Sequence, residues 1–233
     1  IPFETQALDE DFRIRPEDYY RENGGVIFPN PNAPTGLLLS LDAVEDILKH
    51  NQDVVVIVDE AYVDFGGESA RTLLDRYENL LVVQTFSKSR SMAGMRIGFA
   101  MGHPDLIKAL NDVKYSYNSY TMNMPSQILG VEAVKDDAYF KETLAKIIDT
   151  REWSKLKLRE LGFSFPDSKS NFIFATHERV PAEKIFEALK AEQIYVRYFK
   201  QPRLDNYLRI TIGTREEMEA LFAFLGEFLA IAH

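Results

Sequence analysis

The hydrophobic pattern changes along the chain from short apolar runs to longer amphipathic stretches. Four short runs rich in β-branched residues predict buried strands at residues 26–28, 54–58, 80–83 and 97–101. Between the first two runs lies a segment with apolar residues at helical spacing, which Ser40 can cap. The order strand, helix, strand predicts parallel strands in a layered α/β domain. Functional side chains should then gather at the carboxyl ends of these strands.

The second half of the chain is richer in helix signals. The segment from Pro125 to about Leu161 has no proline after its first residue, so it predicts one or two helices that lead out of the first domain. Beyond it, the pattern predicts strands at residues 171–175 and 207–212 and helices at residues 181–191 and 216–230. We therefore expect a large α/β domain at residues 1–150 and a small C-terminal α+β domain at residues 151–233.

Composition and charge narrow the class of protein. The chain has 233 residues, 45% of them apolar, a formal net charge of −9 and no cysteine. The lack of cysteine excludes disulfides, thiolate catalysis and the common zinc sites, and the four histidines show no metal-ligand spacing. The acidic balance argues against nucleic acid as a partner, and no apolar run is long enough to cross a membrane. We expect a cytoplasmic protein that binds small molecules and no metal.

The aromatic-rich stretch at residues 115–120 could be mistaken for a platform on which nucleic-acid bases stack. It lacks the interleaved lysines and arginines that such a site needs. We expect it to belong to the core, to the rim of an active site or to a subunit interface.

A carboxylate stands where an apolar run ends. The sequence Val-Val-Val-Ile-Val-Asp-Glu-Ala-Tyr covers residues 54–62 and places Asp59 at the end of the predicted strand. A buried carboxylate is costly unless it has a partner. Asp59 therefore either caps the next turn or pairs with a basic side chain, or it contacts a cation or a cofactor.

A second candidate group follows the next strand. Lys88 lies in Gln-Thr-Phe-Ser-Lys-Ser-Arg, and Arg96 follows in Ala-Gly-Met-Arg-Ile-Gly-Phe. A lone lysine after a strand is usually solvated. Here the hydroxyl of Ser87, the amine of Lys88 and the guanidinium of Arg96 can together supply a phosphate site and an amine nucleophile.

At this point the chain resembles the fold-type I aminotransferases that use pyridoxal 5′-phosphate, and among them the histidinol-phosphate aminotransferases. Four motifs carry the resemblance in order: Asn-Pro-Asn-Ala-Pro-Thr-Gly at 30–36, Asp-Glu-Ala-Tyr at 59–62, Thr-Phe-Ser-Lys at 85–88 with Arg96, and Leu-Arg-Ile-Thr-Ile-Gly-Thr at 208–214. Ser-Tyr-Asn-Ser-Tyr at 116–120 is also similar to that subfamily. The resemblance implies a three-layer large domain with a parallel-rich sheet, plus a small C-terminal α+β domain.

The resemblance also implies roles for single residues. Lys88 is similar to the lysine that forms the Schiff base with the cofactor and moves the substrate proton. Asp59 is similar to the carboxylate that keeps the pyridine nitrogen protonated, and Tyr62 to the phenol that binds the cofactor's 3′ oxygen. Ser87 and Arg96 match the ligands of the cofactor phosphate.

Two further arginines match residues that bind substrate in this family. Arg209 is similar to the arginine that holds the α-carboxylate, and Arg197 to one that contacts the phosphate of histidinol phosphate. The alternative for Arg197 is a surface salt bridge. The chain departs from many relatives at Ala33, where they have asparagine; Asn32, one position earlier, is the residue we assign to the cofactor's 3′ oxygen.

The resemblance leaves several functions open. The first is transamination between histidinol phosphate and 2-oxoglutarate or glutamate, as in histidine biosynthesis, by a homodimer. The second is an aromatic aminotransferase or a threonine-phosphate decarboxylase. The third is a non-catalytic fragment or split subunit, because the chain starts at Ile1-Pro2-Phe3 without methionine. We expect a cut inside a longer protein, and an isolated chain that is inactive unless another polypeptide supplies the upstream segment.

Overall fold

The computed structural model describes residues 2–231, so Ile1, where we expected an internal cut, and His233, one of the four histidines, lie outside the described residues. The chain divides into two compact units. Unit 1 comprises the residues up to Asn32 and Leu38–Lys141, and unit 2 comprises Ala33–Leu37 and the residues from Glu142 onward. This division and the expected boundary at residue 150 both lie within helix α4 (Asp137–Glu160). The expected domain limits stay a prediction.

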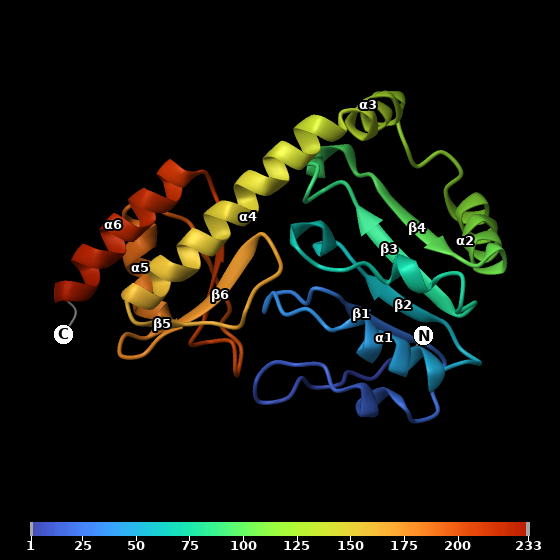
Figure 1. Ribbon diagram of the computed structural model, residues 1–233, viewed down its shortest axis with the longest axis horizontal. Helices are drawn as coiled ribbons and strands as arrows, with labels where there is room; N and C mark the ends of the chain where they lie inside the picture. Colours follow the sequence, from blue (N-terminus) through green and yellow to red (C-terminus); the bar gives the residue numbers. More distant parts are fainter. Residues whose placement is uncertain (1, 232–233) are drawn as a thin grey trace. The chain divides into compact units, whose positions relative to one another are not determined.

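Unit 1 is built on a mixed, mostly parallel sheet, as expected (Figure 1). Its strands are β1 (Val26–Pro29), β2 (Val56–Asp59), β3 (Leu80–Thr85) and β4 (Gly98–Gly102), in the order β1-β2-β3-β4. The first three are parallel, and β4 is antiparallel to β3. β2 begins two residues later than the apolar run predicts, because the amide of Val54 bonds back to Asn51 in a turn.

One face of this sheet is covered by helix α1 (Leu41–Lys49), which starts where predicted: Ser40 Oγ accepts a hydrogen bond from the amide of Ala43 at 3.3 Å. The apolar face of α1 packs on alternate residues of β1 and β2, which is why every second residue of these two strands is buried. The members of this core that come from α1 and the strands are Val26, Phe28, Val44, Ile47, Leu48, Val56, Val58, Leu80 and Val82. Unit 1 also contains the 3-10 helices η1 (Pro16–Tyr19), η2 (Val63–Phe65), η3 (Ala70–Leu73) and η4 (Ala93–Met95).

Two helices that follow β4 are poorly buried. Helix α2 (Pro104–Tyr117) has no buried residue, and α3 (Met124–Lys135) buries Ser126 and Gly130. The aromatic stretch at residues 115–120 lies at the end of α2 and after it, and Tyr117 and Tyr120 are 92% and 94% exposed. Of the three places considered for this stretch, the core is therefore excluded in the described chain, and the rim of an active site or a subunit interface stays a prediction. None of the helices described is long and apolar enough to span a membrane.

Unit 2 has an antiparallel sheet with the order β5-β6-β8-β7. Its strands are β5 (Phe163–Ser164), β6 (Phe172–His177), β7 (Arg197–Tyr198) and β8 (Leu208–Thr211). Helices α4, α5 (Ala182–Ala191) and α6 (Arg215–Ile231) share one apolar core with inward residues of β6 and β8, such as Ile173 and Ile210. The opposite face of β6 and β8 carries Phe174 and Arg209, which are paired across the strands.

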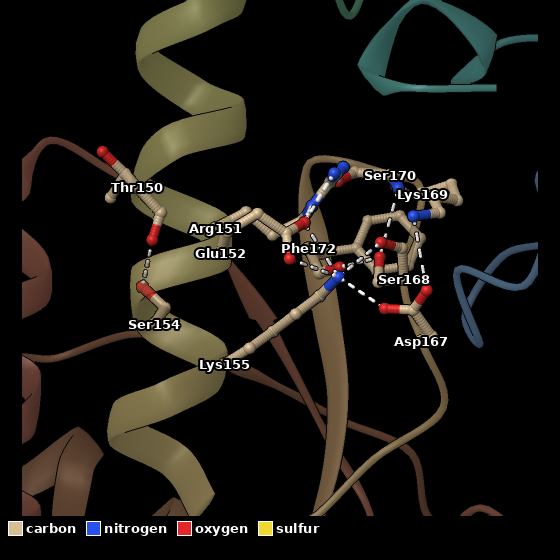
Figure 2. Close-up of polar contacts among 10 residues, drawn as sticks. All are labelled: Thr150, Arg151, Glu152, Ser154, Lys155, Asp167, Ser168, Lys169, Ser170 and Phe172. Atoms are coloured by element: carbon tan, nitrogen blue, oxygen red, sulfur yellow. Dashed lines mark hydrogen bonds and ion pairs between the residues drawn. The ribbon is translucent and has the colours of Figure 1, made fainter.

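Helix α4 carries two buried cations (Figure 2). Lys155 Nζ binds both oxygens of Glu152, at 2.9 and 3.1 Å, and Oδ1 of Asp167 at 2.7 Å. Arg151 NH2 lies 2.8 Å from Oε1 of Glu152. The carbonyls of Ser168 and Ser170 accept from Lys155 and Arg151 at 3.0 and 2.9 Å. Both cations face several acceptors, which is the condition under which a buried cation is tolerated.

The loop at residues 167–170, to which these cations bind, contacts the segment Ala33–Leu37. The amide of Lys169 donates to the carbonyl of Gly36 at 2.8 Å. Gly36 has a positive φ of 76°, and a Cβ there would lie 2.4 Å from Ser168 Oγ. Glycine is required at this point for both reasons.

Candidate functional site

Two of the predicted site residues of unit 1, Asp59 and Lys88, lie at or just after the carboxyl ends of its parallel strands. Asp59 is the last residue of β2 and pairs in register with Val83 of β3. β3 ends at Thr85, and the loop that follows carries Lys88. Because β2 and β3 are parallel, both segments leave the sheet at the same edge. The Lys88 amine lies 5.4 Å from the centre of the Tyr62 ring, which is a cation–π distance.

Asp59 and Lys88 are both half-buried and neither forms an ion pair within residues 2–231. Asp59 Oδ1 accepts the amide of Ala61 at 3.0 Å, so the carboxylate caps its own turn as one interpretation expected. Its remaining acceptor capacity is unused within the described chain. An unpaired anion and an unpaired cation near one sheet edge favour a ligand with complementary groups.

No hydrogen bond joins Ser87 and Arg96 among the described residues. The Ser87 amide donates to Thr85 Oγ1 at 3.1 Å, and Thr85 Oγ1 donates to Ser87 Oγ at 2.9 Å. Arg96 is exposed, has a positive φ of 56° and donates to the carbonyl of Ala93 at 3.0 Å. Asn32 is buried at the end of the unit 1 segment. Their roles as cofactor ligands stay predictions.

Sequence reasoning missed the residues that brace this edge. Glu60, next to Asp59, is buried and accepts from Ser69 Oγ at 2.5 Å, from the Ala70 amide at 2.6 Å and from Gln84 Nε2 at 2.8 Å. Burial raises the pKa of the Glu60 carboxyl, and these donors oppose that shift. The signal available in the sequence was a second acid directly after Asp59, which alone does not separate a ligand from a brace.

The two predicted substrate arginines lie in unit 2, where they occupy opposed positions. Arg197 of β7 pairs with Arg209 of β8 across the antiparallel ladder. The guanidinium of Arg209 lies over the rings of Phe172 and Phe199, at 5.2 and 5.8 Å, and that of Arg197 lies 5.5 Å from Phe199. Phe199 thus contacts both cations, a role that the sequence did not reveal.

No acid neutralises this pair within residues 2–231, so the surface salt bridge considered for Arg197 is absent from the described chain. The Nε of Arg209 is buried and has no hydrogen-bond partner there. Like charges directly opposite on a sheet are destabilising, and an unsatisfied buried donor costs further free energy. The arrangement therefore fits an anion held by planar guanidinium groups.

Comparisons with known proteins show the family to which this chain belongs. The sequence model of the family described as aminotransferase class I and II matches residues 3–225. A histidinol-phosphate aminotransferase of Brachyspira hyodysenteriae is 56% identical over 213 residues, which are 91% of this chain and 60% of that protein. The structure of the histidinol-phosphate aminotransferase from Clostridium acetobutylicum, 25% identical, matches with a TM-score of 0.88 over 96% of this chain and 70% of that chain.

A third relative was solved with a ligand. The histidinol-phosphate aminotransferase from Sinorhizobium meliloti, in complex with pyridoxal-5′-phosphate, is 25% identical and matches with a TM-score of 0.79 over 90% of this chain and 58% of that chain. The present chain spans 60% of the length of the Brachyspira protein. Because the family match extends over nearly all of its residues, the chain belongs to the class I and II aminotransferase family.

Proposed function

We propose that this protein transfers amino groups with pyridoxal 5′-phosphate as its cofactor. The observation that carries the proposal is the carboxyl edge of the unit 1 sheet, where the Lys88 amine lies against Tyr62 and neither Lys88 nor Asp59 has an ion-pair partner among residues 2–231. The cofactor offers an aldehyde for an amine, a ring nitrogen for a carboxylate and a phenolic oxygen for a hydroxyl donor. The donor set therefore fits this cofactor.

Each residue of the set has a distinct task. Bound pyridoxal phosphate supplies an electron sink for the carbanion formed at the substrate's α-carbon. Lys88 would hold the cofactor through its amine and would carry the proton taken from the substrate. Asp59 keeps the ring nitrogen protonated because a nearby anion favours the cationic form. Tyr62 and Asn32 would bind the 3′ oxygen, and Ser87 and Arg96 the phosphate.

For the substrates, we propose histidinol phosphate and 2-oxoglutarate or glutamate. Arg197 and Arg209 support this choice, because an opposed pair of uncompensated guanidinium groups suits either a phosphate or a carboxylate. The related proteins named as histidinol-phosphate aminotransferases support it as well. Arg209 would fix the anionic end of the substrate so that the Cα–H bond is oriented for cleavage.

The first experiment tests cofactor binding. The protein and Lys88→Ala are incubated with pyridoxal phosphate, followed by absorbance, reduced with borohydride and mapped by mass spectrometry. We expect a visible-edge band and an adduct on Lys88 that is absent from the variant. A folded protein that forms no adduct would contradict the proposal and favour a split subunit that needs a partner segment.

The second experiment separates the substrate alternatives. Protein loaded with pyridoxal phosphate and not treated with borohydride is supplied with histidinol phosphate, aromatic amino acids or threonine phosphate, each with and without 2-oxoglutarate. Glutamate formation from histidinol phosphate is the expected result. Preferred turnover of aromatic amino acids, or release of carbon dioxide from threonine phosphate, would assign the protein to one of the alternatives instead.

We also propose that the protein is a cytoplasmic homodimer. The support within the described chain is the apolar surface of α3, where Met124, Ile128, Val131 and Val134 are each more than half exposed. Light scattering coupled to size exclusion measures the assembly state. A monomer at micromolar concentration would contradict this part of the proposal.

A further inference from the structure

The loop that carries Lys88 is tied to the short helix that follows Tyr62. Ser89 Oγ donates a hydrogen bond to Asp64 Oδ2 at 2.5 Å. Ser89 is only 4% exposed, and Asp64 lies in η2, whose N-cap residue is Tyr62. The bond therefore joins a neighbour of Lys88 to a neighbour of Tyr62, the two residues that meet at the candidate site.

Backbone hydrogen bonds close this loop, and the Lys88 carbonyl accepts one from the Ser91 amide at 3.1 Å, but they do not fix the side chain of Lys88. The loop is closed at its base by the Phe86 amide, which donates to the carbonyl of Ile97 at 3.1 Å, and by the Met92 amide, which donates to the carbonyl of Phe86 at 3.1 Å. Lys88 lies between these bonds, on a long side chain with high conformational entropy. A hydrogen bond to a carboxylate is shorter and stronger than a neutral one, so Ser89–Asp64 can restrain the loop next to Lys88.

We propose that Ser89 and Asp64 are positioning residues, which hold the amine of Lys88 against the ring of Tyr62. Neither residue touches the reacting atoms; both act through the backbone of their neighbours. The inference rests on the proposed function for its catalytic consequence, which is a properly aimed amine for covalent capture of the cofactor.

The test uses the full chain and six variants. Ser89→Ala, Asp64→Ala and their double variant remove the link. Ser89→Thr keeps the hydroxyl and Asp64→Asn keeps an acceptor, so both test the link with less risk to folding. Ser91→Ala, an exposed serine of the same loop, is the matched control.

The first readout needs no cofactor. The rate at which acetyl N-hydroxysuccinimide modifies Lys88 is followed by peptide mass spectrometry. We expect acylation about two- to fivefold faster in Ser89→Ala and Asp64→Ala, because the ring contact that shields the amine is worth that much at a partly exposed site. The double variant should react no faster than either single one, since both remove the same bond. Ser89→Thr and Ser91→Ala should match the parent protein, and Asp64→Asn should fall between.

The second readout is the rate of borohydride-trappable capture of pyridoxal phosphate on Lys88. We expect it to fall about tenfold in the variants that lack the link, as misplacement of a reacting group does. The inference would be overturned if the variants had the acylation and capture rates of the parent protein, or if the double variant showed the sum of the two single effects. The proposed function would still stand in that case if the parent protein captured the cofactor. If the parent captured no cofactor but acylation followed the expected pattern, the proposed function would fail and the positioning role would stand.

Discussion

Unit 2 contains two pairs of basic side chains that differ in what neutralises them. Arg151 and Lys155 are almost fully buried, and acids and carbonyls satisfy them from several sides (Figure 2). Arg197 and Arg209 oppose each other on neighbouring strands without any acid among residues 2–231, and one buried nitrogen has no partner there. The protein itself supplies the counter-charges of the first pair, whereas the second pair has none in the described chain and can bind an anionic ligand.

The difference teaches how to separate a structural cation from a binding one. Burial alone does not decide, because the structural pair is the more deeply buried. What decides is whether the protein itself supplies the counter-charge. Breaking the first pair should therefore cost stability, and breaking the second should cost affinity.

The largest effect is expected at Lys155. Lys155→Ala should lower the free energy of unfolding of unit 2 by about 3 kcal/mol, because it removes a fully buried side chain together with its bonds to Glu152, Asp167 and the Ser168 carbonyl. Lys157→Ala is the matched control on the same helix, since it removes an exposed ion pair with Glu160 that is worth at most about 0.5 kcal/mol. Urea denaturation measures both, and equal losses would remove the distinction between the two pairs.

A smaller effect, on affinity, is expected at Arg209. Arg209→Gln should weaken binding of an anionic substrate by about thirtyfold, equivalent to about 2 kcal/mol, because a bidentate charged donor is lost. Arg159→Gln provides the control: its guanidinium also lies over a ring, 5.0 Å from the centre of Phe165, but it has no opposed arginine. Isothermal titration with histidinol phosphate measures the change, and equal affinity in both variants would contradict the assignment.

Arg197 gives the sharpest contrast, with a smaller change in free energy. Arg197→Gln should weaken anion binding about tenfold while leaving the free energy of unfolding unchanged or raising it by up to about 0.5 kcal/mol, because like charges no longer face each other. Thermal and urea unfolding without ligand test the second part. A clear loss of stability would mean that Arg197 has a structural role.

The smallest effect is a pH dependence of the first pair. Burial raises the pKa of Glu152 and of Asp167, but the hydrogen bonds and charge of Lys155, with help from Arg151 and Lys169, outweigh it and leave both pKa values below their ordinary range. A carboxyl whose pKa is lower in the folded state than in the unfolded state stabilises the fold at pH values above its unfolded-state pKa. This contribution is lost as the pH falls through the folded-state pKa. Stability should therefore drop below about pH 4, with a shallower acid slope in Lys155→Ala.

Much of the fold was predictable because its signals are local. Ser40 and the spacing of Val44 and Ile47 marked α1, and apolar runs marked all four strands of unit 1. Local signals did not reveal that β4 runs antiparallel, since direction depends on the connection and not on the apolar run. They also did not reveal that Ala33–Leu37 belongs with unit 2, because that depends on contacts with residues far along the chain.

The candidate site divides in the same way. Lys88, Asp59 and Tyr62 were predicted because their motifs are contiguous, and the structure brings Lys88 and Tyr62 into contact. Ser89 and Asp64 escaped notice because a single hydrogen bond between two loops has no periodicity. The opposition of Arg197 and Arg209 could not be read from the sequence either, because strand register fixes it.

The close packing of Gly36 against Ser168 and Lys169 has a consequence for the order in which the chain can fold during synthesis. Gly36 emerges from the ribosome early, whereas Ser168 and Lys169, against which it seats, are translated much later. The early segment therefore cannot reach its final place until the late loop has been made, even though β1 and α1 on either side of it are already available. Unit 2 can therefore be completed only when its C-terminal residues pack against Ala33–Leu37, a segment made much earlier. A C-terminal fragment without Ala33–Leu37 would lack this packing.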